Sequence, residues 1–450
     1  APHYLFVQQD AALRLEYDGF CRLTDIMPHY GAGVITSRDE FVIDFEDAPL
    51  RDRLRTFSDE GVSDTWIRDN FGIKDNSMWS MSDARTSFRA DPIQKERFVD
   101  YMYRPFDRRR IYFETNVVFN MRTQIMKHLL PGGAPALVTA RQATRRGVLP
   151  AFVTKSVIDA HAITDANSIT TIFPLFISEG GADTPMWAEA TTRINIGAAF
   201  SAELGRCLSE GQQFVDGEPN VGAENILHYL YSILYSPSYC ARYLEFLKID
   251  FPRLPLTRNA EMFRLLSSLG SELFALHLVE SPTLVRTMTE YIGDRNVEVE
   301  KVSWSNHTVW IDKAQRIGFK GVPEEVWNYH VGGYQVCHKW LKDRGPKKGK
   351  PGRTLSAEDI AHYQKVVVAL SETIRIQKEI DEVIEKHGGW PGAFATNAPL
   401  ASEAAAPVAQ PKAQKPKATA KATSTKKAAK DQGTGSSPGY IPDPGEIPFG

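Results

Sequence analysis

The stretch from Tyr101 to Lys155 constrains the fold most, because basic residues alternate there with short apolar runs. It contains ten Lys or Arg residues and two acids, an excess of eight positive charges in a chain of formal net charge -2. The runs at 111–113, 136–140 and 151–154 have the composition of strands, so we expect the basic residues on a folded sheet. Such a sheet is either a phosphate-binding surface or an ordinary solvated basic face, and charge alone leaves both open.

Length and composition set the class of protein. The 450 residues, 42% of them hydrophobic, can bury a large core and are enough for two or three domains. Four cysteines lie far apart without a CxxC pair, which is typical of reduced, buried thiols in a cytosolic protein. No apolar run is long enough to cross a bilayer, and the start of the chain has no signal-peptide pattern. We therefore expect a cytoplasmic protein without membrane contact.

Helical periodicity replaces the strand pattern in the second half of the chain. Apolar residues recur at helical spacing over 224–247, with a break at Ser236-Pro237, and again over 260–278. Ser356 is a good N-cap for a further helix, whose apolar stripe continues to Gly388-Gly389. About 30 residues of helix would be roughly 45 Å long, enough to lie across the domain or onto a neighbour. The expected fold is α+β (mixed), with a β-rich core, a helical subdomain and a long C-terminal helix.

Shorter patterns predict the connecting parts. Residues 34–45 have two short β runs that suggest a hairpin, and residues 48–57 and 63–70 have the pattern of short helices. Alternation over 297–311 predicts a second hairpin, turning at Ser305-Asn306. The segment 389–450 is rich in Ala, Lys and Pro, cannot bury a core, and is expected to be a disordered tail.

Motifs of known catalytic chemistry were not found in the sequence. There is no Pro-Pro dipeptide, which excludes an NPPY-type amino-methyltransferase motif, and there is no GxGxxG, HExxH or GxSxG. His330, Cys337 and His338 lie close together but have no carboxylate or second Cys at ligand spacing, so we expect core or hydrogen-bonding roles and no metal. Asp107, among arginines, is predicted to be an ion-pair partner of Arg104 or Arg109. No catalytic site and no cofactor is therefore expected in this chain.

Several segments carry a resemblance to a known family. They are YRPFDRRRIYF (103–113), HYLYSILYSPSYCARYLEFLKIDFPRLPL (228–256), GGYQVCHKWLKDR (332–344) and RTLSAEDIAHYQKVVVALSETIRIQKEID (353–381). Together they resemble the C-terminal specificity region, or target-recognition domain, of type ISP single-polypeptide restriction-modification enzymes. A more distant similarity is to fused adenine-N6 DNA methyltransferases. In such enzymes a nuclease, a motor and a methyltransferase share one chain with the domain that reads the target.

The resemblance implies a domain that holds double-stranded DNA for adenine-N6 methylation or restriction by other domains. Residues 1–95 would be the connection from an absent upstream methyltransferase domain, and 96–388 the target-recognition domain. Within it, about 96–180 would be rich in sheet and about 220–388 helical. S-adenosylmethionine, ATP and Mg are expected only for the absent parent domains. The implied partners are double-stranded DNA and the methyltransferase and motor or nuclease domains, in cis or in trans.

Candidate DNA contacts follow from side-chain chemistry. Arg matches guanine and Gln matches adenine in the major groove, so residues that end an apolar strand and enter a loop are candidates to read bases: Arg141, Gln142, Arg145 and Arg146. Other basic residues are candidates for phosphate contacts: Arg108, Arg109, Arg110, Arg122, Lys127, Lys155, Lys339, Lys342, Arg344 and Arg353. The YRPF core and Trp340, His362 and Tyr363 are expected to be packing residues.

Two alternatives from other classes remain open. The chain could be an intact or split component of a DNA methyltransferase or nuclease, in which case it would bind S-adenosylmethionine. It could also be a protein-interaction scaffold whose long helix and basic loop, 344–353, dock the missing subunits.

Overall fold

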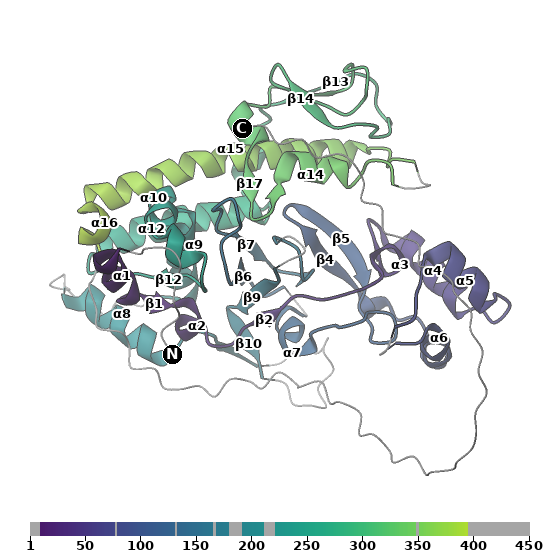
Figure 1. Ribbon diagram of the computed structural model, residues 1–450, viewed down its shortest axis with the longest axis horizontal. Helices are drawn as coiled ribbons and strands as arrows, with labels where there is room; N and C mark the ends of the chain where they lie inside the picture. Colours follow the sequence, from purple (N-terminus) through teal and green to yellow (C-terminus); the bar gives the residue numbers. More distant parts are fainter. Residues whose placement is uncertain are drawn as a thin grey trace, which may run out of the picture. The chain divides into compact units, whose positions relative to one another are not determined.

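The structure, a computed structural model, describes residues 10–76, 79–130, 133–164, 168–179, 191–210, 221–347 and 351–394. Strands and helices are mixed along the chain, which confirms the α+β prediction (Figure 1). The helices, including short 3-10 turns, are α1 (Ala11–Asp18), α2 (Leu23–Ile26), α3 (Asp39–Val42), α4 (Asp47–Ser58), α5 (Asp64–Phe71), α6 (Met81–Ala90), η1 (Lys95–Arg97), α7 (Thr123–Met126), η2 (Lys127–Leu129), α8 (Ala198–Glu210), α9 (Ala223–Tyr235), α10 (Pro237–Arg242), α11 (Leu244–Leu247), α12 (Ala260–His277), η3 (Pro282–Val285), α13 (Glu324–Trp327), α14 (Val336–Lys342), α15 (Ala357–Lys386) and α16 (Gly389–Gly392).

The strands form sheets of two or four members. They are β1 (Cys21–Arg22), β2 (Gly31–Ala32), β3 (Ile43–Asp44), β4 (Phe98–Arg104), β5 (Asp107–Tyr112), β6 (Ala136–Ala140), β7 (Ala151–Thr154), β8 (Val157–Ile158), β9 (Thr170–Pro174), β10 (Phe176–Ser178), β11 (Thr192–Ile194), β12 (Arg253–Leu254), β13 (Glu290–Ile292), β14 (Ser303–Ser305), β15 (Thr308–Trp310), β16 (Gly318–Lys320), β17 (His330–Val331) and β18 (Tyr334–Gln335).

Two four-stranded sheets form the centre, with strand orders β2-β9-β6-β7 and β3-β5-β4-β8. In the first sheet, Val138 of β6 pairs with Phe152 of β7 on one side and Ile172 of β9 on the other. All five residues of β6 are buried, which explains why it lacks polar alternation, and its one polar residue, Thr139, donates its hydroxyl to the Pro150 carbonyl oxygen at 2.6 Å.

The N-terminal segment is part of these sheets. Gly31 of β2 pairs with Ile172, and Ile43 of β3 pairs with Ile111 of β5. The residues before 96 therefore fold together with the domain that follows them, instead of forming a separate connection. Their helices α3, α4 and α6 pack on one another through Phe41, Phe57 and Phe88, while β2 and β3 join sheets whose other strands lie about 70 to 140 residues later in the chain.

A layer of helices covers one side of the sheets, and its helix boundaries follow the predicted ones. Helix α9 ends at Tyr235, and Ser236 then caps α10 by accepting a hydrogen bond from the Tyr239 backbone N–H, with Pro237 in the first turn. Helix α15 has 30 residues and begins with a capping box between Ser356 and Asp359. Figure 1 shows α15 lying along α12 and α14, so the long helix runs across the domain, one of the two positions expected for it.

A third four-stranded sheet, β13-β16-β15-β14, interrupts the region predicted to be helical. Its β14–β15 hairpin was predicted, and its turn lies at Asn306-His307, one residue after the predicted Ser305-Asn306. The sheet packs on the long helix through Phe319 and Tyr363, whose ring centroids are 4.4 Å apart. The sequence did not predict β13 and β16 because these strands pair with each other across about 30 residues, whereas a short turn joins β14 directly to β15.

The packed part of the chain extends beyond the predicted boundary at 388. Trp390 of α16 stacks on Phe394 and lies against Tyr239, and Ala393 and Phe394 are buried. Most of the predicted tail, 395–450, lies outside the described residues. Within the described residues, no helix has both the length and the apolar character needed to cross a membrane. Cys21, Cys207, Cys240 and Cys337 are free thiols, as expected.

Candidate nucleic-acid interface

The four predicted base-reading residues lie together on the loop between β6 and β7. This loop, residues 141–150, is folded tightly: the Thr144 N–H donates to the Val148 carbonyl oxygen at 2.8 Å, and the Gly147 N–H donates to the Thr144 carbonyl oxygen. Gly147 has a φ of +78°, a conformation that a residue without Cβ adopts at little cost. The turn directs the polar side chains outwards, and Arg141, Gln142, Arg145 and Arg146 are all exposed.

Neighbouring segments hold three of these four side chains. Arg141 Nε lies 2.8 Å from Asp250 Oδ1, and Gln142 Nε2 donates to the Ile249 carbonyl oxygen at 3.1 Å. Arg146 Nη1 lies 2.9 Å from His330 Nε2. Because a guanidinium only donates, His330 Nε2 is the acceptor in this contact. Sequence reasoning found the loop but missed Asp250 and His330, which lie 109 and 184 residues from their partners.

The basic motif YRPFDRRR has a largely structural role. Asp107 is fully buried between two guanidiniums, with Oδ2 2.7 Å from Arg109 Nη2 and Oδ1 3.2 Å from Arg344 Nη2. Burial alone would raise the pKa of Asp107, but the charges of Arg344 and Arg109 outweigh it and lower this pKa to about 2. The predicted pair of Asp107 with Arg109 is confirmed, whereas Arg104 pairs with Asp159 instead.

Two predicted phosphate contacts are corrected by this cluster. Arg109 and Arg344 are buried, and both donate to Asp107, so neither guanidinium is free to reach a phosphate. Aromatic rings complete the cluster, since the Arg344 guanidinium carbon lies 3.3 Å from the centroid of the Trp340 ring. Trp340 and Tyr363 are buried as expected, and His362 binds the Phe106 carbonyl oxygen. Sequence reasoning placed Arg109 and Arg344 wrongly because charge alone does not show which face a residue occupies.

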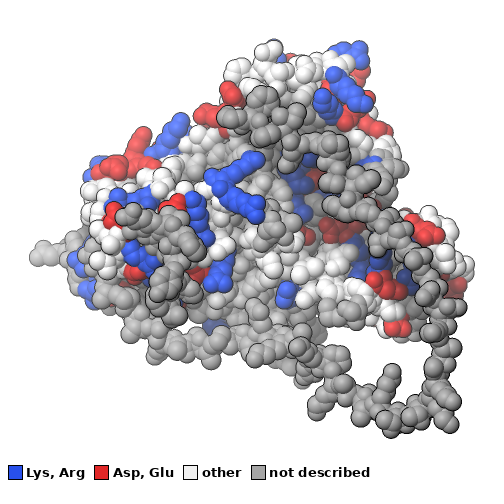
Figure 2. Space-filling model, viewed as in Figure 1, with Lys and Arg blue, Asp and Glu red and all other residues white. Residues whose placement is uncertain are grey.

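The other phosphate candidates lie on different elements and differ in exposure and in whether a carboxylate pairs with them. Arg110 is held by Asp47 and Asp100, and Arg353 by Asp359 and Glu46. Lys155 pairs with Glu280, and Lys339 pairs with Asp343. Arg108 is 73% exposed, with its nearest carboxylate 3.5 Å away, and Lys342 is exposed on α14. Figure 2 shows a group of Lys and Arg side chains near the middle of one face, on an otherwise uncharged part of the visible surface.

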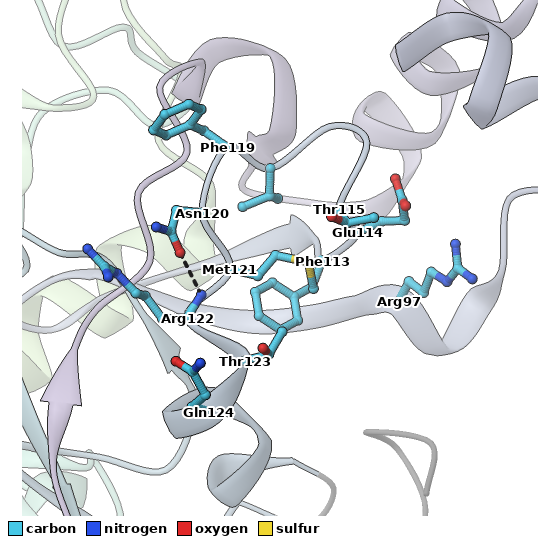
Figure 3. A pocket seen from close by; sticks show the side chains of 11 residues that line it. Arg97, Phe113, Glu114, Thr115, Phe119, Asn120, Met121, Arg122, Thr123 and Gln124 are labelled. Atoms are coloured by element: carbon cyan, nitrogen blue, oxygen red, sulfur yellow. Dashed lines mark hydrogen bonds between the residues drawn. The ribbon is translucent and has the colours of Figure 1, made fainter. Parts of the chain in front are cut away.

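Arg122 lines a pocket of about 480 Å³ that is formed mainly by the segment 113–124, and Lys127 is half-buried in η2, after α7 (Figure 3). The Arg122 N–H donates to Asn120 Oδ1 at 3.2 Å, and Arg122 has a φ of +51° at the start of α7. Its Nε atom is buried and has no hydrogen-bond partner among the described residues. Arg97 lies at the opposite side of the pocket, where it pairs with Asp91 at 2.6 Å and where the Glu114 carboxylate also lines the opening (Figure 3). The lining therefore carries charges of both signs.

The three residues His330, Cys337 and His338, for which core or hydrogen-bonding roles were predicted, have separate partners. His330 holds Arg146, Cys337 is buried with its thiol near the Val326 carbonyl oxygen, and the His338 ring packs edge-on against Trp327. Among the described residues, no three His, Cys, Asp or Glu side chains are placed to hold a metal ion.

Comparison with protein families decides the classification. The model of the Type ISP C-terminal specificity domain matches residues 25–379. The chain belongs to the Type ISP C-terminal specificity domain family. The matched range begins inside the N-terminal segment, in agreement with the pairing of β2 and β3 in the central sheets of this specificity domain. No curated protein matches the chain significantly.

Three solved structures have the same fold as this specificity domain. They are a nuclease-deletion mutant of the Type ISP restriction-modification enzyme LlaGI in complex with a DNA substrate mimic (TM-score 0.56, 18% identity), the ATP-dependent Type ISP enzyme LlaBIII bound to DNA (0.61, 17%) and a DrdV–DNA complex (0.62, 19%). Each similarity covers 83% of this chain but only 29%, 24% and 39% of the other chain, respectively. At these identities the likeness concerns the fold.

Proposed function

We propose that this specificity domain recognises a sequence in double-stranded DNA and positions it for adenine-N6 methylation or restriction by other domains. The observation that carries the proposal is the β6–β7 loop, where Arg141, Gln142, Arg145 and Arg146 stand exposed on a tightly folded turn. Base reading needs donors held on a rigid element, since a mobile side chain loses more conformational freedom on binding. Family membership and the DNA-bound state of the similar structures support the same function.

Fewer residues are candidates for phosphate contacts in this proposal than the charge pattern of the sequence suggests. Arg108, Lys342, Arg122 and Lys127 remain as candidates, because Arg108 is 73% exposed with a carboxylate only at 3.5 Å and no carboxylate of the described residues pairs with the other three. S-adenosylmethionine, ATP and Mg belong, in this proposal, to the methyltransferase and motor domains of a parent enzyme. Those domains are the proposed protein partners, in cis or in trans.

Binding of labelled duplexes by the purified chain tests the proposal. We expect binding at low salt that weakens steeply as salt rises, with a log–log slope of about -3 to -4 if the four candidates each contact one phosphate. Selection from a randomised duplex library should enrich one asymmetric sequence. Absence of duplex binding at low salt, together with capture of a partner protein, would instead favour the scaffold alternative. Binding of labelled S-adenosylmethionine would favour the enzyme alternative.

A further inference from the structure

The segment after α11 docks on the β6–β7 loop at several points. The Ala143 N–H donates to the Leu247 carbonyl oxygen at 2.8 Å, and Gln142 Nε2 donates to the Ile249 carbonyl oxygen. Two residues later, the Phe251 ring packs against Phe173 of β9 and against the half-exposed Tyr30. Residues 247–251 are therefore held in place from both ends and form part of the same surface as the loop.

Asp250 lies between these anchors, and its carboxylate faces Arg141. Both side chains are largely exposed, 59% for Asp250 and 68% for Arg141. An ion pair this exposed contributes little to the stability of the fold, because water screens both charges. A carboxylate on a phosphate-binding surface also weakens nonspecific DNA binding through repulsion. Stability and general DNA affinity therefore do not explain an acid at this position.

The geometry of the pair suggests a different role. Asp250 Oδ1 accepts a hydrogen bond from the Nε–H of Arg141. Among the described residues, the two terminal nitrogens of this guanidinium have no hydrogen-bond partner. These form the fork that matches the O6 and N7 acceptors of a guanine edge in the major groove. The contact with Asp250 restricts the rotation of this fork. In addition, a carboxylate rejects phosphates and carbonyl oxygens and accepts a hydrogen bond from the cytosine N4 amino group.

We propose that Asp250 is a specificity-determining residue that works with Arg141 to select a guanine, with its cytosine partner or a neighbouring cytosine, in the major groove. The inference rests on the proposed function, because it concerns how the same surface reads DNA. It adds a second segment, residues 247–251, to a reading surface that the sequence places on the β6–β7 loop alone.

Selection from a randomised duplex library, followed by binding measurements on the full chain, tests this inference. The variants are Arg141→Ala, Asp250→Asn, which removes the charge with little change of shape, and the double variant. Glu245→Gln is the matched control, because Glu245 is an exposed acid on the adjoining α11 and pairs with Lys248 instead of Arg141. Thermal unfolding of each variant verifies that the fold is retained.

We expect Asp250→Asn to lose the preference for guanine at the same position as Arg141→Ala, by roughly 5- to 100-fold, while affinity for scrambled duplexes rises. The double variant should lose no more at that position than Arg141→Ala alone. Glu245→Gln should raise nonspecific affinity and keep the selected sequence. If Asp250→Asn behaves like Glu245→Gln, or changes a different position from Arg141→Ala, the inference is wrong. If the wild-type chain selects no sequence, the proposed function itself fails and the inference with it.

Discussion

Asp107 Oδ1 lies 3.2 Å from Nη2 of Arg344, a residue 237 positions later in the chain. This contact joins the two basic segments of the sequence inside the protein. Arg109 completes the cluster from the same strand as Asp107, so the buried Asp107 carboxylate contacts two buried guanidiniums, and Asp359 lies 3.7 Å from the Nε atom of Arg344. The β4–β5 hairpin is thereby attached to α14, the short helix that precedes Arg344, and a part of the positive charge is removed from the surface.

Replacing Asp107 by Asn should destabilise the fold strongly. The variant removes the paired carboxylate of Arg109 and leaves Arg344 with Asp359 alone, at 3.7 Å, and loss of one partner from a buried ion pair costs about 3–5 kcal/mol. Urea denaturation measures the change in the free energy of unfolding. Asp52→Asn is the control, because the Asp52 side chain is 72% exposed in its pair with Arg55, and its loss should change stability by less than about 0.5 kcal/mol. Equal effects of the two substitutions would contradict the structural role of Asp107.

Acid should destabilise the protein through His277 before it protonates Asp107. His277 is fully buried between the Tyr231 hydroxyl and Thr373 Oγ1, and burial lowers its pKa from 6.5 to about 3. The folded state therefore keeps the ring neutral where the unfolded chain binds a proton. The free energy of unfolding is therefore unaffected by this ring above pH 6.5. As the pH falls from 6.5 towards 3, protonation of the ring in the unfolded chain lowers the free energy of unfolding by about 1 kcal/mol per pH unit.

Urea denaturation of His277→Gln between pH 6 and 4.5 checks this expectation. The variant should be less stable than the wild type at pH 7, but its stability should fall less with decreasing pH. His128, whose pKa burial lowers to about 4, is retained in both proteins and contributes equally to both slopes. Identical slopes in the variant and the wild type would show that His277 does not remain neutral in the fold.

A Cβ at Gly270 should separate α12 from α9. An alanine there would place this atom 1.9 Å from the carbonyl oxygen of His228, so the two helices would have to move apart. We expect Gly270→Ala to lower the free energy of unfolding by at least about 1–3 kcal/mol, the usual range for overpacking. Gly205→Ala on α8 is the control: it meets no atom within 4 Å, so it should stabilise the protein by about 0.5–1 kcal/mol. Stabilisation by both substitutions would mean that the contact between α9 and α12 is looser than described.

Substitutions at the candidate phosphate contacts and at the candidate base contacts should have different effects on DNA binding. Arg122→Ala or Lys127→Ala should weaken binding to all duplexes alike and reduce the log–log salt slope by about 1. Arg145→Ala should instead reduce discrimination between the selected and scrambled duplexes, because its exposed side chain lies on the reading loop. Anisotropy titrations at several salt concentrations distinguish the two outcomes. A uniform loss of affinity for Arg145→Ala would place it among the phosphate contacts.

Local patterns in the sequence were sufficient for most of the elements. The break at Ser236-Pro237 and the cap at Ser356 appear in the structure as predicted, because caps, proline and helical periodicity act between residues a few positions apart. The exposed β6–β7 loop was predicted for the same reason, since it begins where an apolar strand ends. The strands β13 and β16 pair with each other across about 30 residues, so no local turn pattern marks them, and they form because partners elsewhere complete their hydrogen bonds.

By itself the sequence determined the mixed fold class, the long capped helix and the loop that carries Arg141 to Arg146. Only the tertiary structure decided which charges are available. Arg108 and Arg109 are adjacent in the sequence, yet one is exposed and the other is buried against Asp107, because successive residues of a strand face opposite sides of the sheet. Likewise, Asp250 pairs with Arg141, 109 residues earlier in the chain, and this pairing depends on how the end of α11 docks on the β6–β7 loop. Charge pattern is a local property of the chain, whereas the choice of ion-pair partner depends on long-range packing.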